Sequence, residues 1–335
     1  LVLREGGRTD PFNFSVPFPQ PYIPRSLTFE VKERISAQGK IITPLDKNSL
    51  IKIINHMKKK EIESIAVCLL WSTVNPIHEK KIGDLLDTQL PKIPFTLSHE
   101  LNPVLREYRR ASSTCIDASL KPLMTEYILN LQDNLKERGF QGRLLMLTSK
   151  GGVMDYKEIA EAPIHTVGSG PAMAPIAGRY FAKIDSKSST AIVADTGGTT
   201  YDVSLVRNGE IPMTPETWLG DKYQGNILGF SSVDVKSIGA GGGSIAWVDE
   251  GGLLHVGPKS AGANPGPACY GKGGVFPTVT DACLILGYID ADYFLGGKMK
   301  LDLIKARKSI NKYICKPLNL KLNEGAQAIL HLATE

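Results

Sequence analysis

The segment 195–203 reads Asp-Thr-Gly-Gly-Thr-Thr-Tyr-Asp-Val and lies between the apolar runs 191–194 and 203–206. This order predicts a strand, a tight turn and a returning strand. The adjacent glycines Gly197 and Gly198 let the backbone turn sharply, and they leave backbone N–H groups free to surround an anion. The segment therefore predicts a β-hairpin whose turn can bind an anion.

Polar side chains flank the two glycines. Thr199 and Thr200 add hydroxyl donors at the turn, while Asp195 and Asp202 stand at its two ends. A carboxylate does not bind a bare phosphate, but it does bind a divalent cation that neutralises the phosphate. The pattern predicts a Mg²⁺-nucleotide clamp in which both aspartates are catalytic and hold the metal. The alternative is an ordinary hairpin turn, built from Asp, Gly and Thr for turn chemistry alone. The candidate phosphate contacts are Gly197, Gly198, Thr199 and Thr200.

The composition is that of an ordinary soluble protein. The 335 residues include 42% hydrophobic and 22% charged residues, which is enough for two domains. The net charge of +5 comes from scattered lysines, and the densest run, 58–60, fits a solvated helix end, so nucleic-acid binding gains no support. The five cysteines are dispersed and no apolar run has membrane-spanning length, which predicts a cytoplasmic protein that does not bind membranes.

The first third of the chain alternates predicted strands with predicted helices. The apolar run 65–71 predicts a central strand and 95–97 another, with helical patterns starting near Asp46 and Asn75. Such alternation predicts an α/β layer with parallel strands. One long amphipathic pattern over 113–138 predicts a helix that joins this layer to a second one.

A second glycine cluster, 239–244, reads Gly-Ala-Gly-Gly-Gly-Ser. It fails as a dinucleotide-binding motif, because Ser244 stands where a glycine is needed and a strand pattern follows instead of a helix. We expect a loop whose backbone approaches a ligand or the facing clamp turn, the alternative being close packing of backbone on backbone. A third cluster, 260–271, is too rich in Gly and Pro for regular structure and is expected to be functional. The candidate ligand-facing residues are Gly241, Gly242, Gly243 and Ser244.

Six segments carry specific motifs, and together they cover most of the chain. They are 107–110 (Glu-Tyr-Arg-Arg), 169–172 (Ser-Gly-Pro-Ala), 195–203, 238–246, 256–271 and 277–282 (Pro-Thr-Val-Thr-Asp-Ala). In these segments the chain resembles the hydantoinase A / 5-oxoprolinase family, and in particular its N-methylhydantoinase A-like subunits.

The resemblance implies an α/β, actin-like ATPase fold made of two ribonuclease-H-like halves, with ATP and Mg²⁺ as cofactors. The halves would divide this chain into a partial first domain over 1–110, a connecting helix over 111–140 and a second domain over 141–335. The family's first phosphate loop and its adenosine loop are absent here, and the chain starts at a leucine and stops in a helical pattern. We therefore expect a piece of a longer subunit that carries half of an ATP site and is inactive alone.

The family implies an ATP-dependent enzyme that opens a cyclic amide, such as a hydantoin or 5-oxoproline, by phosphorylating the amide oxygen. It also implies a hydantoinase B-like partner subunit or domain, and homo-oligomerisation is left open. Two alternatives remain: a subunit of an acetone-type carboxylase, and a non-catalytic scaffold for the partner. An actin-like sugar kinase is disfavoured because of the long 260–271 loop. Departures from the family's usual residues at Lys150, 173–174 and Lys236 mean that its usual substrates do not transfer by resemblance alone.

Overall fold

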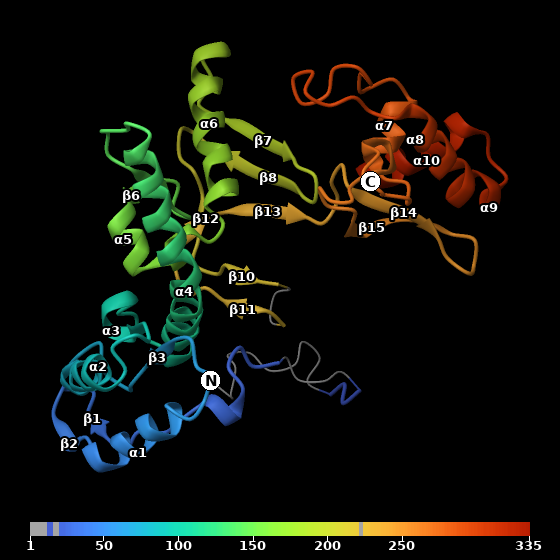
Figure 1. Ribbon diagram of the computed structural model, residues 1–335. Helices are drawn as coiled ribbons and strands as arrows, with labels where there is room; N and C mark the ends of the chain where they lie inside the picture. Colours follow the sequence, from blue (N-terminus) through green and yellow to red (C-terminus); the bar gives the residue numbers. More distant parts are fainter. Residues whose placement is uncertain (1–11, 16–19, 221–223) are drawn as a thin grey trace. The chain divides into compact units, whose positions relative to one another are not determined.

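The computed structural model describes residues 12–15, 20–220 and 224–335 (Figure 1). The chain divides into two compact units, each described here by itself. Unit 1 comprises 1–176 and 211–234, and unit 2 comprises 177–210 and 235–335. The boundaries between these units lie at 176/177, 210/211 and 234/235, and not at the predicted domain boundaries 110 and 140. The assignment of ribonuclease-H-like domains to 1–110 and 141–335 stays a prediction.

Unit 1 combines helices with short two-stranded sheets. Its strands are β1 (Arg34–Ile35), β2 (Ile41–Thr43), β3 (Ile65–Val67), β4 (Phe95–Leu97), β5 (Leu145–Leu147), β6 (Val153–Asp155), β9 (Met213–Thr214), β10 (Trp218–Leu219), β11 (Asn226–Ile227) and β12 (Ser232–Val233). Its helices are η1 (Arg25–Leu27), α1 (Lys47–Met57), α2 (Ile77–Gln89), α3 (Ser98–Leu101), α4 (Glu107–Glu137), α5 (Tyr156–Glu161) and η2 (Pro163–Thr166). A further helix, α6 (Ser169–Asp185), continues from unit 1 into unit 2.

The predicted parallel pairing is confirmed in unit 1. Strands β3 and β4 run parallel, with Ile65 opposite Phe95 and Val67 opposite Leu97. Helices α1 and α2 pack against this pair through a buried apolar cluster, while α4 also contacts both strands. Two layers of helix around a parallel pair make this part of the chain α/β, as the alternation of patterns predicts.

Helix α4 starts at Glu107, six residues before the predicted start at 113. The sequence pattern misses this first turn and a half because two of its three buried positions, Arg110 and Ser112, are polar, and the third is the small Ala111. Arg110 is 1% exposed. Hydrophobic periodicity cannot reveal a helical face that is buried through hydrogen bonds instead of apolar contacts.

A buried polar cluster joins α2, α4 and the ends of β3 and β4. The carboxylate of Glu79, fully buried, accepts hydrogen bonds from Leu69 N (2.7 Å), Ser98 Oγ (2.7 Å), His99 N (3.0 Å) and His99 Nδ1 (2.7 Å). Arg110 donates to Ser98 Oγ (3.0 Å) and to the carbonyl of Leu69 (2.6 Å). The two side chains thus fix the chain at the carboxyl end of β3, and their charges are compensated where water cannot reach them.

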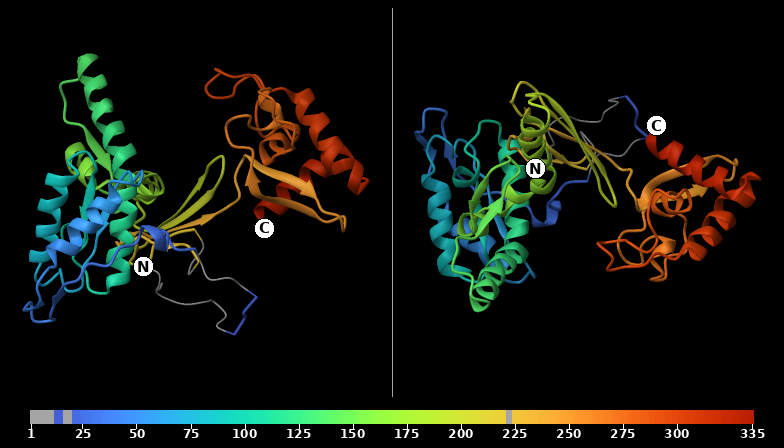
Figure 2. Two further views of the ribbon diagram at one scale, coloured as in Figure 1. Left: turned by 60° about the horizontal axis from the view of Figure 1, so that its bottom comes forward. Right: turned by 90° about the horizontal axis from the view of Figure 1, so that it is seen from above.

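Unit 2 contains an antiparallel sheet, a hairpin and a helical group. Its strands are β7 (Ala191–Thr196), β8 (Tyr201–Val206), β13 (Val235–Ile238), β14 (Ser244–Val248) and β15 (Leu254–Ser260). Its helices are η3 (Ala268–Tyr270), α7 (Val279–Ile285), α8 (Leu303–Ile310), the π-helical turn η4 (Asn311–Cys315), α9 (Lys316–Leu318) and α10 (Leu322–Thr334). The hairpin β14–β15 lies beside the helices of the same unit in both views of Figure 2.

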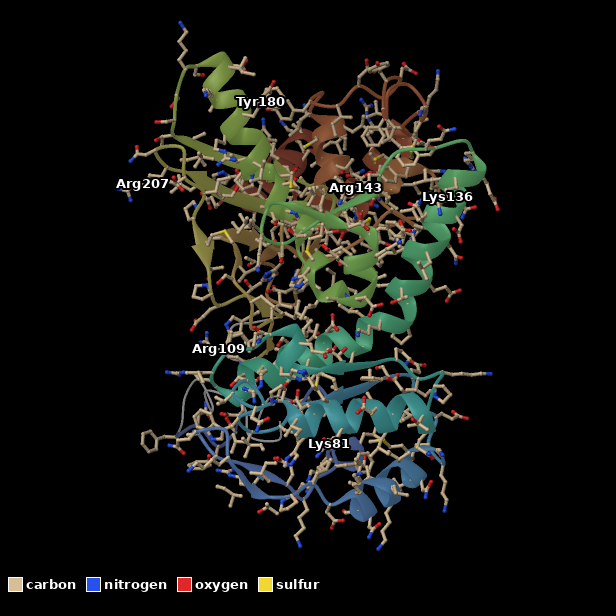
Figure 3. All side chains as sticks on the ribbon, turned by 90° about the vertical axis from the view of Figure 1, so that its left-hand side faces the viewer. Lys81, Arg109, Lys136, Arg143, Tyr180 and Arg207 are labelled. Atoms are coloured by element: carbon tan, nitrogen blue, oxygen red, sulfur yellow. The ribbon has the colours of Figure 1, made fainter. Side chains whose placement is uncertain are left out.

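The three-stranded sheet has the order β13-β8-β7, and α6 lies alongside it (Figure 1). The approach of α6 is close, because a Cβ on Gly178 would come within 2.2 Å of a Val193 methyl group. Only glycine fits there without movement. Tyr180, on the same helix, is 63% exposed (Figure 3). The helix therefore comes closest to the sheet at Gly178.

Replacing Glu79 with Gln tests the buried cluster. The amide keeps the shape but turns an NH₂ group toward N–H and O–H donors, so we expect the free energy of unfolding to fall by about 2–4 kcal/mol in chemical denaturation. Glu100→Gln is the matched control, since that side chain is 63% exposed and should change stability by less than about 0.5 kcal/mol. Equal effects of the two variants would contradict the account.

Candidate functional site

The clamp segment forms the predicted hairpin. Strands β7 and β8 are antiparallel, and Asp195 is directly opposite Asp202. Residues directly opposite on antiparallel strands point to the same face, with Cβ atoms about 4.5–5.5 Å apart. The two carboxylates therefore share one face beside the turn, with Asp195 exposed and Asp202 9% exposed.

Hydroxyl groups orient the Asp202 carboxylate. Ser237 stands opposite Asp202 on β13, and its Oγ donates a hydrogen bond to Oδ1. Thr200 donates to Oδ2 over 3.4 Å. Asp202 is thus held in one orientation. Asp195 lies beside it on the edge strand β7 and stays exposed.

The second glycine cluster packs directly on the clamp turn, within unit 2. The N–H of Gly242 donates to the carbonyl of Gly197 (3.0 Å), and the N–H of Gly243 donates to that of Gly198 (2.7 Å). A Cβ on Gly241 would lie 2.8 Å from Gly197 O and from the Thr199 backbone. Backbone meets backbone here with no room for any side chain. The loop therefore approaches the facing clamp turn, and it does so through the close packing of backbone on backbone that is the alternative expectation. A ligand contact of Gly241, Gly242, Gly243 and Ser244 stays a prediction.

This contact determines which N–H groups a ligand could use. The N–H of Gly241 donates to Ser244 Oγ (2.9 Å), and that of Ser244 donates to Gly241 O (3.0 Å), so with the two bonds to the clamp turn all four amides of the loop are engaged. In the clamp turn, the N–H of Gly197 donates to Thr200 O (2.9 Å). Within the described residues, no hydrogen bond is made by the N–H of Gly198, Thr199 or Thr200. The available anion donors are on the clamp turn itself.

Two further residues, missed as site residues in the sequence, hold the glycine-rich loops: Thr280 holds the 239–244 loop and Asp281 holds the 260–271 loop. Thr280 donates both its N–H (2.8 Å) and its hydroxyl (2.7 Å) to the carbonyl of Gly242. Asp281, fully buried, accepts hydrogen bonds from the N–H groups of Ala268 (3.2 Å) and Cys269 (2.7 Å), inside the 260–271 loop. The segment 277–282 carries both residues, so its motif was the available signal.

Burial raises the pKa of the Cys269 thiol, and the negative charge of Asp281 raises it further by a smaller amount. The thiol is fully buried and stays protonated at neutral pH. Cys269 therefore serves as a packed residue of the 260–271 loop and not as a nucleophile.

The carboxylate pair fits a hard divalent cation. Two like charges directly opposite on neighbouring strands repel each other unless a cation lies between them. Asp195 and Asp202 supply oxygen ligands of the kind that Mg²⁺ prefers. Across the described residues, no group of three or more His, Cys, Asp or Glu side chains could hold a metal ion. A Mg²⁺ ion at this pair would need phosphate oxygens and water to complete its shell, as is usual for Mg²⁺ bound with a nucleotide.

The positions that depart from the family pattern have distinct surroundings. In unit 1, the ammonium group of Lys150 lies 6.0 Å from the centre of the Phe230 ring. Burial, and to a lesser extent the Lys150 charge, lowers the pKa of His165. In unit 2, Lys236 is exposed on β13, next to Ser237.

None of the helices in the described part is both long enough and apolar enough to cross a membrane.

The described fold is a mixed α/β protein with a glycine-rich hairpin turn, held by a second glycine loop and flanked by two carboxylates. Comparison with known proteins identifies its family. The hydantoinase/oxoprolinase family model matches residues 110–335, and the model of the family's N-terminal region matches residues 1–90. The chain belongs to the hydantoinase/oxoprolinase family.

Named relatives narrow the comparison. The chain is 35% identical to caprolactamase subunit alpha of Pseudomonas jessenii, over 99% of this chain and 47% of the relative. The crystal structure of the ATP-dependent caprolactamase from that organism superposes with a TM-score of 0.74 at 35% identity, covering 98% of this chain and 46% of the other. Nucleotide-free acetone carboxylase gives a TM-score of 0.80 at 28% identity, covering 94% and 44%. The chain spans about half the length of the curated relatives it matches.

Alanine substitutions test the contact between the two glycine loops. In Gly241→Ala or Gly243→Ala the new Cβ meets backbone atoms at 2.8 Å, so we expect each change to lower the free energy of unfolding by about 1–3 kcal/mol. Gly239→Ala is the matched control, because no atom lies within 4 Å of its Cβ. Urea denaturation measures all three. Variants at 241 and 243 that are as stable as the control would show that the loops are not in contact.

Proposed function

We propose that the hairpin turn 197–200 is one phosphate clamp of an ATP-dependent subunit that opens a cyclic amide. The observation that carries the proposal is the set of unengaged N–H groups, those of Gly198, Thr199 and Thr200, on a turn that a second loop holds in place. Preorganised backbone donors of this kind bind phosphate oxygens without reorganising.

Each residue of the clamp has a separate role in this proposal. The N–H groups of Gly198 and Thr199, with the Thr199 hydroxyl, contact the transferring phosphate. Asp195 and the oriented Asp202 hold Mg²⁺, which neutralises phosphate charge during transfer. Phosphorylation of the amide oxygen makes the ring carbonyl carbon an easier target for water. The chain's contribution is positioning and charge stabilisation, the main requirements of phosphoryl transfer.

The residues 241–244 take a different role from direct phosphate binding. Their N–H groups are engaged, two of them with the clamp turn. We infer that this loop sets the shape of the clamp, and that any ligand contact from it comes through backbone carbonyls or the Ser244 side chain. The actin-like ATPase fold remains part of the proposal, supported by the similarity to ATP-dependent caprolactamase over 98% of this chain.

The clamp is proposed as half of a nucleotide site. Three of the matched relatives are about twice as long as this chain. We expect the 335-residue chain alone to bind ATP weakly and the full-length protein to bind it fully. A partner subunit of the hydantoinase B type is also proposed, and the naming of relatives as alpha, gamma and beta subunits supports a multi-subunit enzyme.

A carboxylase subunit is the second candidate. It is favoured by one observation, the TM-score of 0.80 with acetone carboxylase. In this candidate the same clamp would hold the ATP of an ATP-dependent carboxylation. The two candidates differ only in the molecule that accepts the phosphate. No described residue favours one acceptor over the other.

Phosphate release by the full-length protein with its partner subunit tests the proposal. With Mg-ATP, we expect release to be stimulated by 5-oxoproline, a hydantoin or caprolactam, and not by acetone with bicarbonate. Asp195→Asn should lower kcat by about 100-fold or more. Asp292→Asn is the matched control, since its surface ion pair with Lys300 is 79% exposed on both sides.

The other outcomes separate the alternatives. Stimulation by acetone with bicarbonate alone would favour the carboxylase. No binding heat with Mg-ATP in calorimetry of the full-length protein would favour the non-catalytic scaffold. Unchanged hydrolysis in Asp195→Asn would overturn the role of the clamp.

A further inference from the structure

A row of lysines follows one face of a helix in unit 2. Helices α8 and α9 and the π-helical turn η4 between them form one continuous helix, 303–318, because the residues at both junctions keep right-handed helical angles. Four exposed lysines occur along it at spacings of three and four residues, which places them on one face. We call them the basic ridge: Lys305, Lys308, Lys312 and Lys316.

The π-helical turn keeps the ridge in line. Four residues complete slightly more than one turn of an α-helix but less than one turn of a π-helix, so Lys316 stays in register with Lys308. The opposite face of the helix is buried at Ile310 and Ile314. Helix α10 packs there so closely that a Cβ on Gly325 would lie 2.6 Å from the Sγ of Cys315. The lysines therefore point away from the core of their own unit.

The ridge has almost no acidic side chains to balance it. The segment 303–323 contains six Lys and Arg residues and no Asp or Glu, and this local charge exceeds the net charge of +5 of the whole chain. In the described part of the chain, Lys305 pairs with Asp302 over 3.6 Å, and the other three lysines of the ridge make no ion pair. Like charges at these spacings repel each other, and solvated helices usually mix both signs. The ridge therefore indicates an anionic partner.

An apolar strip, formed by Val275, Phe276 and Tyr313, lies along one side of the ridge. Ser309 Oγ donates a hydrogen bond to Val275 O (2.8 Å), which holds this segment against α8. The ring centres of Phe276 and Tyr313 are 5.4 Å apart, and the Lys312 ammonium group lies 4.7 Å from the centre of the Tyr313 ring. Val275 is 56% exposed and Phe276 is 49% exposed. Exposed apolar and aromatic side chains beside a charged rim are typical of a protein–protein interface.

We propose, resting on the partner subunit of the proposed function, that the basic ridge and the apolar strip bind an acidic surface of that subunit. Charge complementarity identifies the occupant, because the local excess of positive charge attracts a surface rich in Asp and Glu. Lysines suit the polar rim between two separate chains and not the interior of one chain, so the rest of the same polypeptide does not cover the ridge. A nucleic-acid backbone would match the lysines but leave the apolar strip uncovered.

Charge reversal in the full-length protein tests the ridge. The triple variant Lys308→Glu, Lys312→Glu and Lys316→Glu should raise the Kd for the partner subunit by about 100-fold or more in calorimetry. For the wild type, raising NaCl from about 50 mM to about 500 mM should raise the Kd by at least about 10-fold. The matched control reverses the three exposed lysines 58–60, which changes the net charge equally and should leave the Kd within about 2-fold.

The other outcomes are separable. Equal Kd values for the ridge variant and the control would overturn the proposal, as would no binding between the wild type and the partner. A ridge variant that loses affinity for a short DNA duplex but keeps its partner would assign the ridge to nucleic acid instead. Lys→Gln at the same three positions should weaken binding in the same direction but less, which covers any failure of the Glu variant to fold. Asp195→Asn should bind the partner as the wild type does, so a failure of the clamp is distinguishable from a failure of the ridge.

Lysine labelling of the wild-type full-length protein gives a second, independent readout. In the protein without its partner, acetic anhydride should modify Lys308, Lys312 and Lys316 about as fast as the exposed Lys59. With the partner at about ten times its Kd, these three lysines should react about 10-fold more slowly, and Lys59 at an unchanged rate. Mass spectrometry measures the modification. Protection without the partner would overturn the proposal, since the cover would then come from the same chain.

Discussion

The candidate site depends on the contact between two glycine loops, in which the backbone of 241–243 lies against the backbone of 197–199. Two hydrogen bonds, from Gly242 N to Gly197 O and from Gly243 N to Gly198 O, join them. Backbones come this close only where side chains are missing, and a Cβ at 241 or 243 would lie 2.8 Å from the facing atoms. The contact fixes the shape of the clamp turn and decides which of its amides remain open. Thr280 anchors the 239–244 loop through Gly242, and Asp281 anchors the 260–271 loop through Cys269.

The two units hold their loops by the same physical means, a buried carboxylate that accepts several hydrogen bonds. In unit 1, Glu79 fixes the carboxyl end of β3 together with Arg110. In unit 2, Asp281 fixes the 260–271 loop through Ala268 and Cys269. Irregular, glycine-rich backbone offers little apolar surface to bury. Charge-assisted hydrogen bonds to backbone N–H groups replace that missing stabilisation.

Sequence patterns predicted the parts of the structure that depend on apolar periodicity or on glycine turns. The hairpin at 195–203, the parallel pair and the approach of the second glycine loop to the clamp all followed from apolar runs and glycine positions. The start of α4 did not, because Arg110 and its neighbours are buried through hydrogen bonds. Ser237 and Thr280 were also missed as site residues, since their roles depend on strand register and on a contact between segments far apart in sequence. Local patterns carry no information about such contacts.

The central claim is that the amides of Gly198 and Thr199 bind phosphate while those of Gly242 and Gly243 only support the turn. Amide chemical shifts of the full-length protein, titrated with Mg-ATP, test it most directly. The account predicts large downfield shifts for the amide protons of Gly198 and Thr199 and small changes for Gly242 and Gly243. Unchanged Gly198 and Thr199 resonances at a saturating nucleotide concentration would contradict it.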